Sequence, residues 1–163
     1  MKKVDIVRET FPFEDGFFQL ITFSEVLEHL PIESVYPVLQ EIYRVLEKSG
    51  KIIVSSPNQA AILNRIHLLR GKSILELPVT LEYAGGTYGH IRLYTPEEFV
   101  MLASAVGFEV RKITCNDNYL KHVKSDSLIK NIVYKIFLWL GRVYRPGVLN
   151  FGDTWFALCE KNN

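Results

Sequence analysis

The sequence predicts an α/β fold in which helices pack against a mostly parallel sheet. Short apolar, β-branched runs alternate with amphipathic segments of helix length through the first two thirds of the 163 residues. Such alternation is typical of parallel strands joined by crossover helices. The composition, 48% hydrophobic and 23% charged, excludes a disordered, collagen-like or coiled-coil chain. The length fits a single domain over residues 1–163.

The first two expected strands are Val4 to Val7 and Phe17 to Phe23. The segment 11–16 between them contains proline, aspartate and glycine, which favour a turn. The run FFQLITF has one polar residue, so it is expected to be a strand buried on both faces. Ser24 is then expected to cap a short helical turn that ends at Leu30.

The next elements are predicted in the same way, from apolar runs for strands and amphipathic spacing for helices. A helix is expected from about Glu33 to Glu47, with Gly50 as its left-handed cap. Lys51 to Ser55 is expected to be a second buried strand, followed by a helix over residues 58–70. Thr95, which precedes a proline and two glutamates, is expected to start a further helix that ends at Gly107.

The last expected elements are two strands and a basic helix between them: Phe108 to Cys115, Ser127 to Tyr144 and Thr154 to Glu160. The helix carries a broad apolar stripe with lysines beside it. It is interpreted either as a helix that covers the core or as an interfacial helix in peripheral contact with anionic lipid.

The net charge and the cysteine content indicate which partners and which cellular compartment to expect. The formal net charge of +1 provides no field that would attract nucleic acid, so no nucleic-acid partner is expected. Cys115 and Cys159 are far apart and are expected to be free thiols. The N-terminus lacks the apolar core of a signal peptide, and no apolar run is long enough to span a membrane. We therefore expect a cytoplasmic protein.

The run SEVLEHL at residues 24–30 is the most informative for chemistry. On a helical turn, Glu25, Glu28 and His29 share one face. Ligands of parallel α/β sheets bind at the carboxyl ends of strands, where this run and residues 56–58 are expected to lie. The three side chains are interpreted as a divalent-metal site or a general acid or base, and alternatively as a solvated face whose charges only pair.

The segment 85–94 supplies a second set of candidates. His90, Arg92 and Tyr94 alternate, so on an extended segment they would project to one side as a substrate-contacting edge. The alternative is a solvated loop in which Ile91 and Leu93 point inward. The glycines at 85, 86 and 89 predict a flexible lid or substrate loop.

Seven runs, taken in order, resemble the class I S-adenosylmethionine-dependent methyltransferases. They are FPFEDG at 11–16, FFQLITF at 17–23, SEVLEHL at 24–30, EIYRVL at 41–46, KIIVSSPN at 51–58, GHIRLYTPEE at 89–98 and AVGF at 105–108. Together they extend from residue 5 to about 115. The resemblance implies a Rossmann-like three-layer sandwich with a mostly parallel sheet. It also implies S-adenosylmethionine as cofactor and methyl transfer to a small-molecule or lipid-like acceptor.

The resemblance also implies roles for individual residues. Phe11, or Asp5 at the end of the preceding strand, would lie near the adenine of the cofactor. The backbone at Phe23 and Ser24, together with Glu25, would approach its methionine end. His29 would be the catalytic base. His90, with Arg92 and Tyr94, would face the acceptor substrate.

A metal is implied by one subgroup of the family. The ubiquinone-pathway and small-RNA 2′-O-methyltransferases hold magnesium with a Glu-x-x-Glu-His run. Glu25, Glu28 and His29 match this spacing, and His90 would be a fourth ligand.

One departure from the family affects the whole assignment. The family begins with a strand that leads into a glycine-rich loop, which holds the cofactor, and then has an acidic residue for the ribose hydroxyls; this sequence has neither the strand with its loop nor that acidic residue. The chain is therefore expected to be an N-terminally truncated, C-terminal part of a methyltransferase fold, with the first strands absent. The alternative is a non-catalytic truncated or split protein. It would need a partner chain, or self-association, at the sheet edge formed by Val4–Val7 or Phe18–Phe23. A Rossmann dehydrogenase would also need the missing glycine-rich turn.

Overall fold

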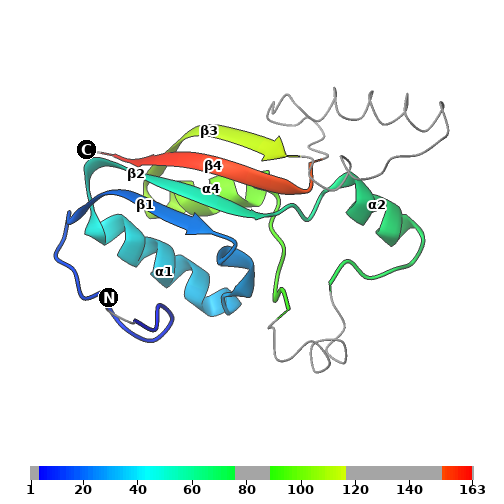
Figure 1. The fold of residues 1–163 in the computed structure, drawn as a ribbon, viewed down its shortest axis with the longest axis horizontal. Helices are drawn as coiled ribbons and strands as arrows, with labels where there is room; N and C mark the ends of the chain where they lie inside the picture. The colour runs from blue at the N-terminus through cyan, green and yellow to red at the C-terminus, as the bar shows by residue number, and fades with distance from the viewer. Residues whose placement is uncertain (1–3, 76–88, 117–151, 163) are drawn as a thin grey trace.

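The computed structural model describes residues 4–75, 89–116 and 152–162. They contain one four-stranded sheet and the helices that pack on it (Figure 1). The strands are β1 (Phe18–Ser24), β2 (Leu46–Pro57), β3 (Phe108–Asn116) and β4 (Thr154–Lys161). The described helices are the 3₁₀ turn η1 (Leu27–His29), α1 (Ile32–Val45), α2 (Ile62–Leu69) and α4 (Pro96–Val106). The expected alternation of strands and helices is confirmed.

The strand directions agree with a mostly parallel sheet, but the order of the strands was not predicted. The order is β1-β2-β4-β3, and β1 and β2 are parallel. β4 runs antiparallel to both β2 and β3, between which it inserts. Three of the four strands therefore share one direction, whereas two of the three pairings are antiparallel.

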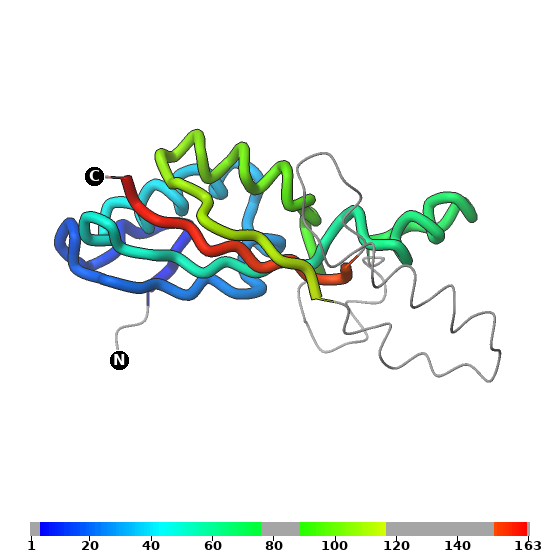
Figure 2. Tube along the Cα trace, turned by 90° about the horizontal axis from the view of Figure 1, so that it is seen from above, coloured from blue at the N-terminus to red at the C-terminus, as the bar shows by residue number. Residues whose placement is uncertain are grey.

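The two faces of the sheet differ in burial. Alternate residues on one face are buried: Phe23, Ile52, Val54, Trp155, Ala157 and Cys159. α1 and α4 contact each other and cover this same face (Figure 2). The opposite face, which we call the open face, carries Leu20, Ile53, Phe156 and Leu158, and Leu20 is 54% exposed. Since no helix among the described residues covers it, those residues form two of the three expected layers.

The expected strand at Val4–Val7 is wrong. Asp5 accepts hydrogen bonds from the backbone N–H groups of Arg8 and Glu9, and its carboxylate accepts another from Val7. These local bonds close a turn and replace the ladder bonds that a strand would need.

The expected cap at Gly50 is also wrong. α1 ends at Val45, and the chain enters β2 at Leu46, where the backbone is already extended. Gly50 lies within β2, and a Cβ there would come within 2.8 Å of the Glu47 carbonyl oxygen. Close backbone approach, not helix termination, accounts for this glycine.

The strand at 17–23 and the helix start at Ser24 need partial correction. β1 is confirmed, but it is an edge strand of the described sheet, so only Phe23 is fully buried. Ser24 is the last residue of β1. The short helical turn is confirmed as η1, but it is preceded by Val26 without a side-chain cap. The helix expected over 58–70 begins only at Ile62.

α4 has both of its predicted ends. The side chain of Thr95 accepts a hydrogen bond from the backbone of Glu98, whose carboxylate accepts one from the Thr95 backbone, which completes a capping box. Gly107 ends the helix with φ 112°, a conformation that favours glycine.

Two further expectations concern the whole chain. Both cysteines are free as predicted, and burial raises the pKa of the Cys159 thiol to about 12. None of the described helices has the length and apolarity needed to cross a membrane. The helix expected at 127–144 and the glycine loop at 85–88 lie outside the described residues.

Candidate functional site

The candidate site lies at the carboxyl edge of β1 and β2. The two strands are parallel and in register, with Ser24 opposite Ser55, so they end at the same edge. η1 follows β1 directly, and residues 56–58 complete β2 and its exit. The structure therefore brings SEVLEHL and residues 56–58 together, as predicted for an α/β sheet.

Ser24, Glu25 and Ser55 form a hydrogen-bonded polar group at this edge. The Ser55 hydroxyl donates to Glu25 Oε1 at 2.7 Å and lies 3.1 Å from Ser24 Oγ. The Glu25 backbone N–H donates to the Ser55 carbonyl at 3.0 Å. Glu25 has a φ of 53°, in the left-handed region that residues with a Cβ seldom adopt. The Glu25 carboxylate is thus tied to β2 through Ser55.

Glu28 is the only charged side chain among the described residues that is fully buried, with 0% of its surface exposed. Its Oε2 accepts a hydrogen bond from Ser56 Oγ at 3.0 Å, while Oε1 has no hydrogen-bond partner. Burial raises the pKa of this carboxyl above its ordinary value, because the charged form loses its hydration. An unpaired, buried carboxylate oxygen indicates a site for a proton or a ligand.

His29 and His90 lie beside this oxygen. His29 Nε2 is 4.0 Å from Glu28 Oε1, and the centres of the two imidazole rings are 5.0 Å apart. The carbonyl of Glu28 accepts hydrogen bonds from the backbone N–H groups of Ile91 and Arg92, which anchor the 90–94 segment over η1. One carboxylate oxygen and two ring nitrogens consequently lie within 4.8 Å of one another.

This set differs from the one expected for a metal. Glu28, His29 and His90 converge as predicted, but Glu25 is not among the grouped residues, because Ser55 holds its carboxylate. A donor set of one carboxylate and two imidazoles is typical of transition metals, whereas magnesium prefers oxygen donors.

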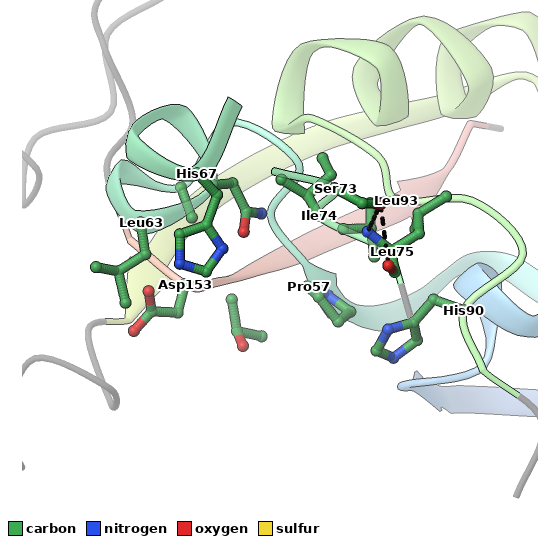
Figure 3. Close-up of a pocket in the computed structure, with 12 residues that line it drawn as sticks. Pro57, Leu63, His67, Ser73, Ile74, Leu75, His90, Leu93 and Asp153 are labelled. Atoms are coloured by element: carbon green, nitrogen blue, oxygen red, sulfur yellow. Dashed lines mark hydrogen bonds between the residues drawn. The ribbon is translucent and has the colours of Figure 1, made fainter. Parts of the chain in front are cut away.

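A cavity of about 500 Å³ lies next to this cluster, beyond the end of β2 (Figure 3). It is lined by Pro57, by Leu63 and His67 of α2, by segment 73–75, by His90 and Leu93, and by Asp153 and Thr154 at the start of β4. Sequence reasoning did not single out His67 or Asp153. They come from segments about 86 positions apart, so no local pattern could have connected them.

Of the three predicted substrate residues, only His90 lines this cavity. Tyr94 is 3% exposed and belongs to the core, and its carbonyl accepts a hydrogen bond from Trp155. Arg92 forms an ion pair with Glu98 at 2.8 Å and lies over the Tyr94 ring. The segment is irregular, so alternate residues do not project to one side.

The other predicted cofactor residues lie apart from Glu25. The Phe23 ring is buried in the core, which leaves its backbone at the carboxyl edge. Phe11 is held against the last turns of α1, since its N–H donates to Glu41 and its carbonyl accepts from Arg44. Phe11 lines an apolar groove of about 300 Å³ beside β1, and Asp5 lies in the turn at the rim of this groove.

Asn58 is a buried residue whose role sequence reasoning missed. Its amide donates to the Gly152 carbonyl at 2.8 Å, and its Oδ1 accepts from the Ala60 N–H at 3.0 Å. These bonds connect the exit of β2 to the start of β4 and to the residues before α2. A polar residue directly after a buried strand was the available signal.

Replacing Glu28 with glutamine is expected to stabilise the protein at neutral pH. The raised pKa means that the folded protein holds this proton more tightly than the unfolded chain. The associated stability is complete below the ordinary glutamate pKa of 4.5 and is lost as pH rises through the folded-state value. E28Q removes that loss and keeps an acceptor for Ser56, so its Tm should exceed that of the wild type by about 2–4 °C at pH 7.

The measurement is thermal unfolding of both proteins from about pH 4 to pH 8. The gain should disappear at the acidic end, where Glu28 is protonated. Glu14→Gln, an exposed position in the 11–16 turn that is not among the causes of the raised Glu28 pKa, provides the control and should give no such pH-dependent gain. Equal effects of both substitutions would contradict the assignment of Glu28 as the destabilising buried charge.

Comparisons with known proteins identify the family and the fold of the chain. A family model described as a methyltransferase domain matches residues 2–113. No curated protein matches the chain. The fold is similar to a SAM-dependent methyltransferase from Archaeoglobus fulgidus (TM-score 0.62, 20% identity) and to one from Methanosarcina mazei (TM-score 0.59, 15% identity). It is also similar to a methyltransferase from Haloferax volcanii in complex with the Trm112 methyltransferase activator (TM-score 0.56, 12% identity).

Each match covers nearly all of this chain but only part of the similar structure. The matches cover 98%, 99% and 98% of this chain, and 66%, 66% and 60% of the Archaeoglobus, Methanosarcina and Haloferax chains. The chain thus spans about two thirds or less of the length of these structures.

Proposed function

Because this chain belongs to the class I S-adenosylmethionine-dependent methyltransferases, we propose that its carboxyl-edge site takes part in methyl transfer from S-adenosylmethionine to a small-molecule or lipid-like acceptor. The observation that carries the proposal is the juxtaposition of two polar groups at one sheet edge. The Ser24–Glu25–Ser55 group lies at the end of β1 and β2, and the Glu28–His29–His90 set lies next to it.

The residues at this edge fit the cofactor in their chemistry. The Glu25 carboxylate, oriented by the Ser55 hydroxyl, suits the ammonium group of an amino acid. Away from this edge, along the first half of β1, the apolar groove that contains Phe11 suits a planar ring, and Asp5 lies between two residues that line it, Val4 and Ile6. We therefore propose that Ser24, Glu25 and the Phe23 backbone hold the methionine end and that Asp5 or Phe11 lies near the adenine. When bound, the cofactor would supply an electrophilic methyl group.

The contribution of the protein to such a transfer is mainly positional. In-line displacement depends on holding the acceptor atom at the correct distance and angle. His29 would act as general base for acceptors that must lose a proton. Glu28, 4.0 Å from His29 Nε2, would stabilise the imidazolium that forms when His29 accepts that proton. His90, on the cavity side, would contact the acceptor, and Arg92 would fix this segment through Glu98.

A bound cation is a separate proposal that rests on the same residues. Glu28, His29 and His90 would hold a divalent metal, which would then polarise the acceptor oxygen. Titration with Mn²⁺ and Mg²⁺, monitored by calorimetry on wild type and His90→Ala, tests it. If the wild type binds Mn²⁺ and the H90A variant does not, the result supports the metal site. If neither ion gives heat with the wild type, the metal site is excluded.

The alternative is a non-catalytic protein that binds cofactor only with a partner chain. β1 pairs with one strand within the described sheet; its own Leu20 is 54% exposed, and Phe17, which directly precedes it, is 60% exposed. Unpaired, apolar strand edges favour association. The Haloferax methyltransferase, whose fold is similar, was solved in complex with an activator protein.

Calorimetric titration with S-adenosylhomocysteine separates the two. Independent cofactor binding is expected to give a Kd below about 100 μM, equivalent to about −5.5 kcal/mol. Glu25→Gln should weaken this binding about tenfold, because it removes a charge-assisted contact to the ammonium group. If the folded chain gives no heat at millimolar ligand, independent cofactor binding is excluded and the partner-dependent alternative is favoured.

A further inference from the structure

Ser55 holds both the backbone and the side chain of Glu25 at the carboxyl edge. Its carbonyl accepts a hydrogen bond from the Glu25 backbone N–H at 3.0 Å, and its hydroxyl donates to Glu25 Oε1 at 2.7 Å. The first bond extends the pairing of β1 and β2 by one residue, since Ser24 lies opposite Ser55 at the end of β1. A single residue of β2 therefore fixes two separate groups of Glu25.

The backbone conformation of Glu25 indicates that its side chain is needed at this position. Its φ of 53° lies in the left-handed region, which favours glycine over residues with a Cβ. Strained conformations of this kind persist where surrounding contacts fix them, and they cluster at functional sites. A glycine would form the same turn without strain, so the glutamate points to a role for its carboxylate.

The direction of the hydrogen bonds at Ser55 follows from its proton count. A serine hydroxyl has one proton, and an ionised carboxylate only accepts. The Ser55 proton is therefore used at Glu25, and the 3.1 Å contact between the two serine hydroxyls requires Ser24 to donate. The three side chains form a chain of hydrogen bonds that runs from Ser24 through Ser55 to Glu25, in which each bond strengthens the next.

One oxygen of Glu25 is anchored and the other is available. Oε1 is held by Ser55, whereas Oε2 accepts no hydrogen bond from the described residues, and the Glu25 side chain is exposed. Ser55 is 2% exposed, so the packing of the sheet fixes its hydroxyl. A carboxylate held in this way is suited to a charge-assisted bond with a cation, such as the ammonium group of an amino acid.

We propose that Ser55 is a positioning residue for cofactor binding, whose hydroxyl fixes the Glu25 carboxylate in the orientation that receives the ammonium group at the methionine end. Without this bond, Glu25 would lose side-chain freedom when the ligand binds, and that loss would lower the affinity. The inference rests on the proposed function and deepens it, because it assigns recognition of the amino group to a residue that acts through Glu25.

Calorimetric titration of the full chain with S-adenosylhomocysteine tests this role on single and double variants. Ser55→Ala should weaken binding about tenfold, and Glu25→Ala at least as much. The double variant S55A/E25A should bind no more weakly than E25A, because Ser55 acts through the carboxylate that E25A removes. If Ser55 only stabilised the edge of the sheet, S55A would weaken binding in the E25A background as well.

Thr22→Val is the matched control. Thr22 is an exposed residue of β1, two positions before Ser24, and the substitution also removes one hydroxyl. It should leave the Kd of S-adenosylhomocysteine within about twofold of the wild-type value. Circular dichroism of each variant confirms that the comparison is between folded proteins.

The outcomes separate this inference from the proposed function. A loss in S55A that disappears in the E25A background supports the inference. If S55A binds as tightly as the wild type, or weakens binding equally in both backgrounds, the inference is overturned while the proposed function stands. If the folded wild-type chain gives no heat at millimolar ligand, both the inference and independent cofactor binding are overturned.

Discussion

Replacing Trp155 with alanine is expected to lower the free energy of unfolding by about 3–5 kcal/mol. The indole is fully buried at 0% exposure and stacks on Phe99, with ring centres 4.7 Å apart. Its Nε1 donates a hydrogen bond to the Tyr94 carbonyl at 3.0 Å. The substitution leaves a cavity between β4 and α4 and removes one of the hydrogen bonds that hold the 90–94 segment on the sheet. Tm should fall by about 10 °C, measured by thermal unfolding.

Phe156→Ala is the matched control for this prediction. Phe156 is the next residue of β4 and projects to the open face, where it is 37% exposed. Its truncation should cost about 2 kcal/mol or less, since Phe156 keeps more than a third of its surface exposed whereas Trp155 has none exposed. Equal losses for the two variants would contradict the assignment of one buried and one open face.

Replacing Asn58 with alanine is expected to cost about 2–4 kcal/mol. The change removes the donor to the Gly152 carbonyl and the acceptor of the Ala60 N–H, and Asn58 itself is fully buried. Buried polar groups that lose their partners carry the full cost of their desolvation. Denaturant unfolding measures the change.

Asn58→Asp separates the hydrogen bond from the volume of the side chain. An ionised aspartate retains the acceptor for Ala60 but places an oxygen against the Gly152 carbonyl. A protonated one can donate to that carbonyl. N58D should therefore be much less stable than the wild type at pH 7, and the difference should shrink as the pH falls. A pH-independent difference would show that the Gly152 contact does not control stability.

The sequence predicted those features that neighbouring residues control. The capping box of α4 depends on Thr95 and Glu98, three positions apart, and the Gly107 cap on a single backbone conformation. β1, β2 and α1 were predicted because their apolar spacing matches one period each. Where a local alternative existed, prediction failed: Asp5 closes a turn at Val4–Val7, and the close contact at Glu47 explains Gly50 without a cap.

The part of the candidate site that depends on neighbouring residues was also predicted from the sequence. Glu28 and His29 are adjacent in sequence, and the rule for parallel sheets placed them at the carboxyl edge. The spacing alone also placed Glu25 with them. In the structure Glu25 has a positive φ and its carboxylate accepts a hydrogen bond from Ser55, so it is not part of the Glu28–His29–His90 group, and neither feature is encoded by spacing. Arg92 and Tyr94 were assigned to one side because an extended segment was assumed, but the 90–94 segment is irregular.

The sequence by itself determined the family, the order of the elements and the edge of the sheet where the chemistry is placed. Each of these depends on short-range patterns or on motifs in a fixed order. Only the tertiary structure decided that β4 inserts between β2 and β3, that Glu28 is buried beside His29 and His90, and that Asp153 shares a cavity with His67. Apart from the adjacent Glu28 and His29, these contacts join residues 38 to 109 positions apart. Their existence depends on which faces pack together and exclude water, a property of the assembled fold that no local sequence pattern specifies.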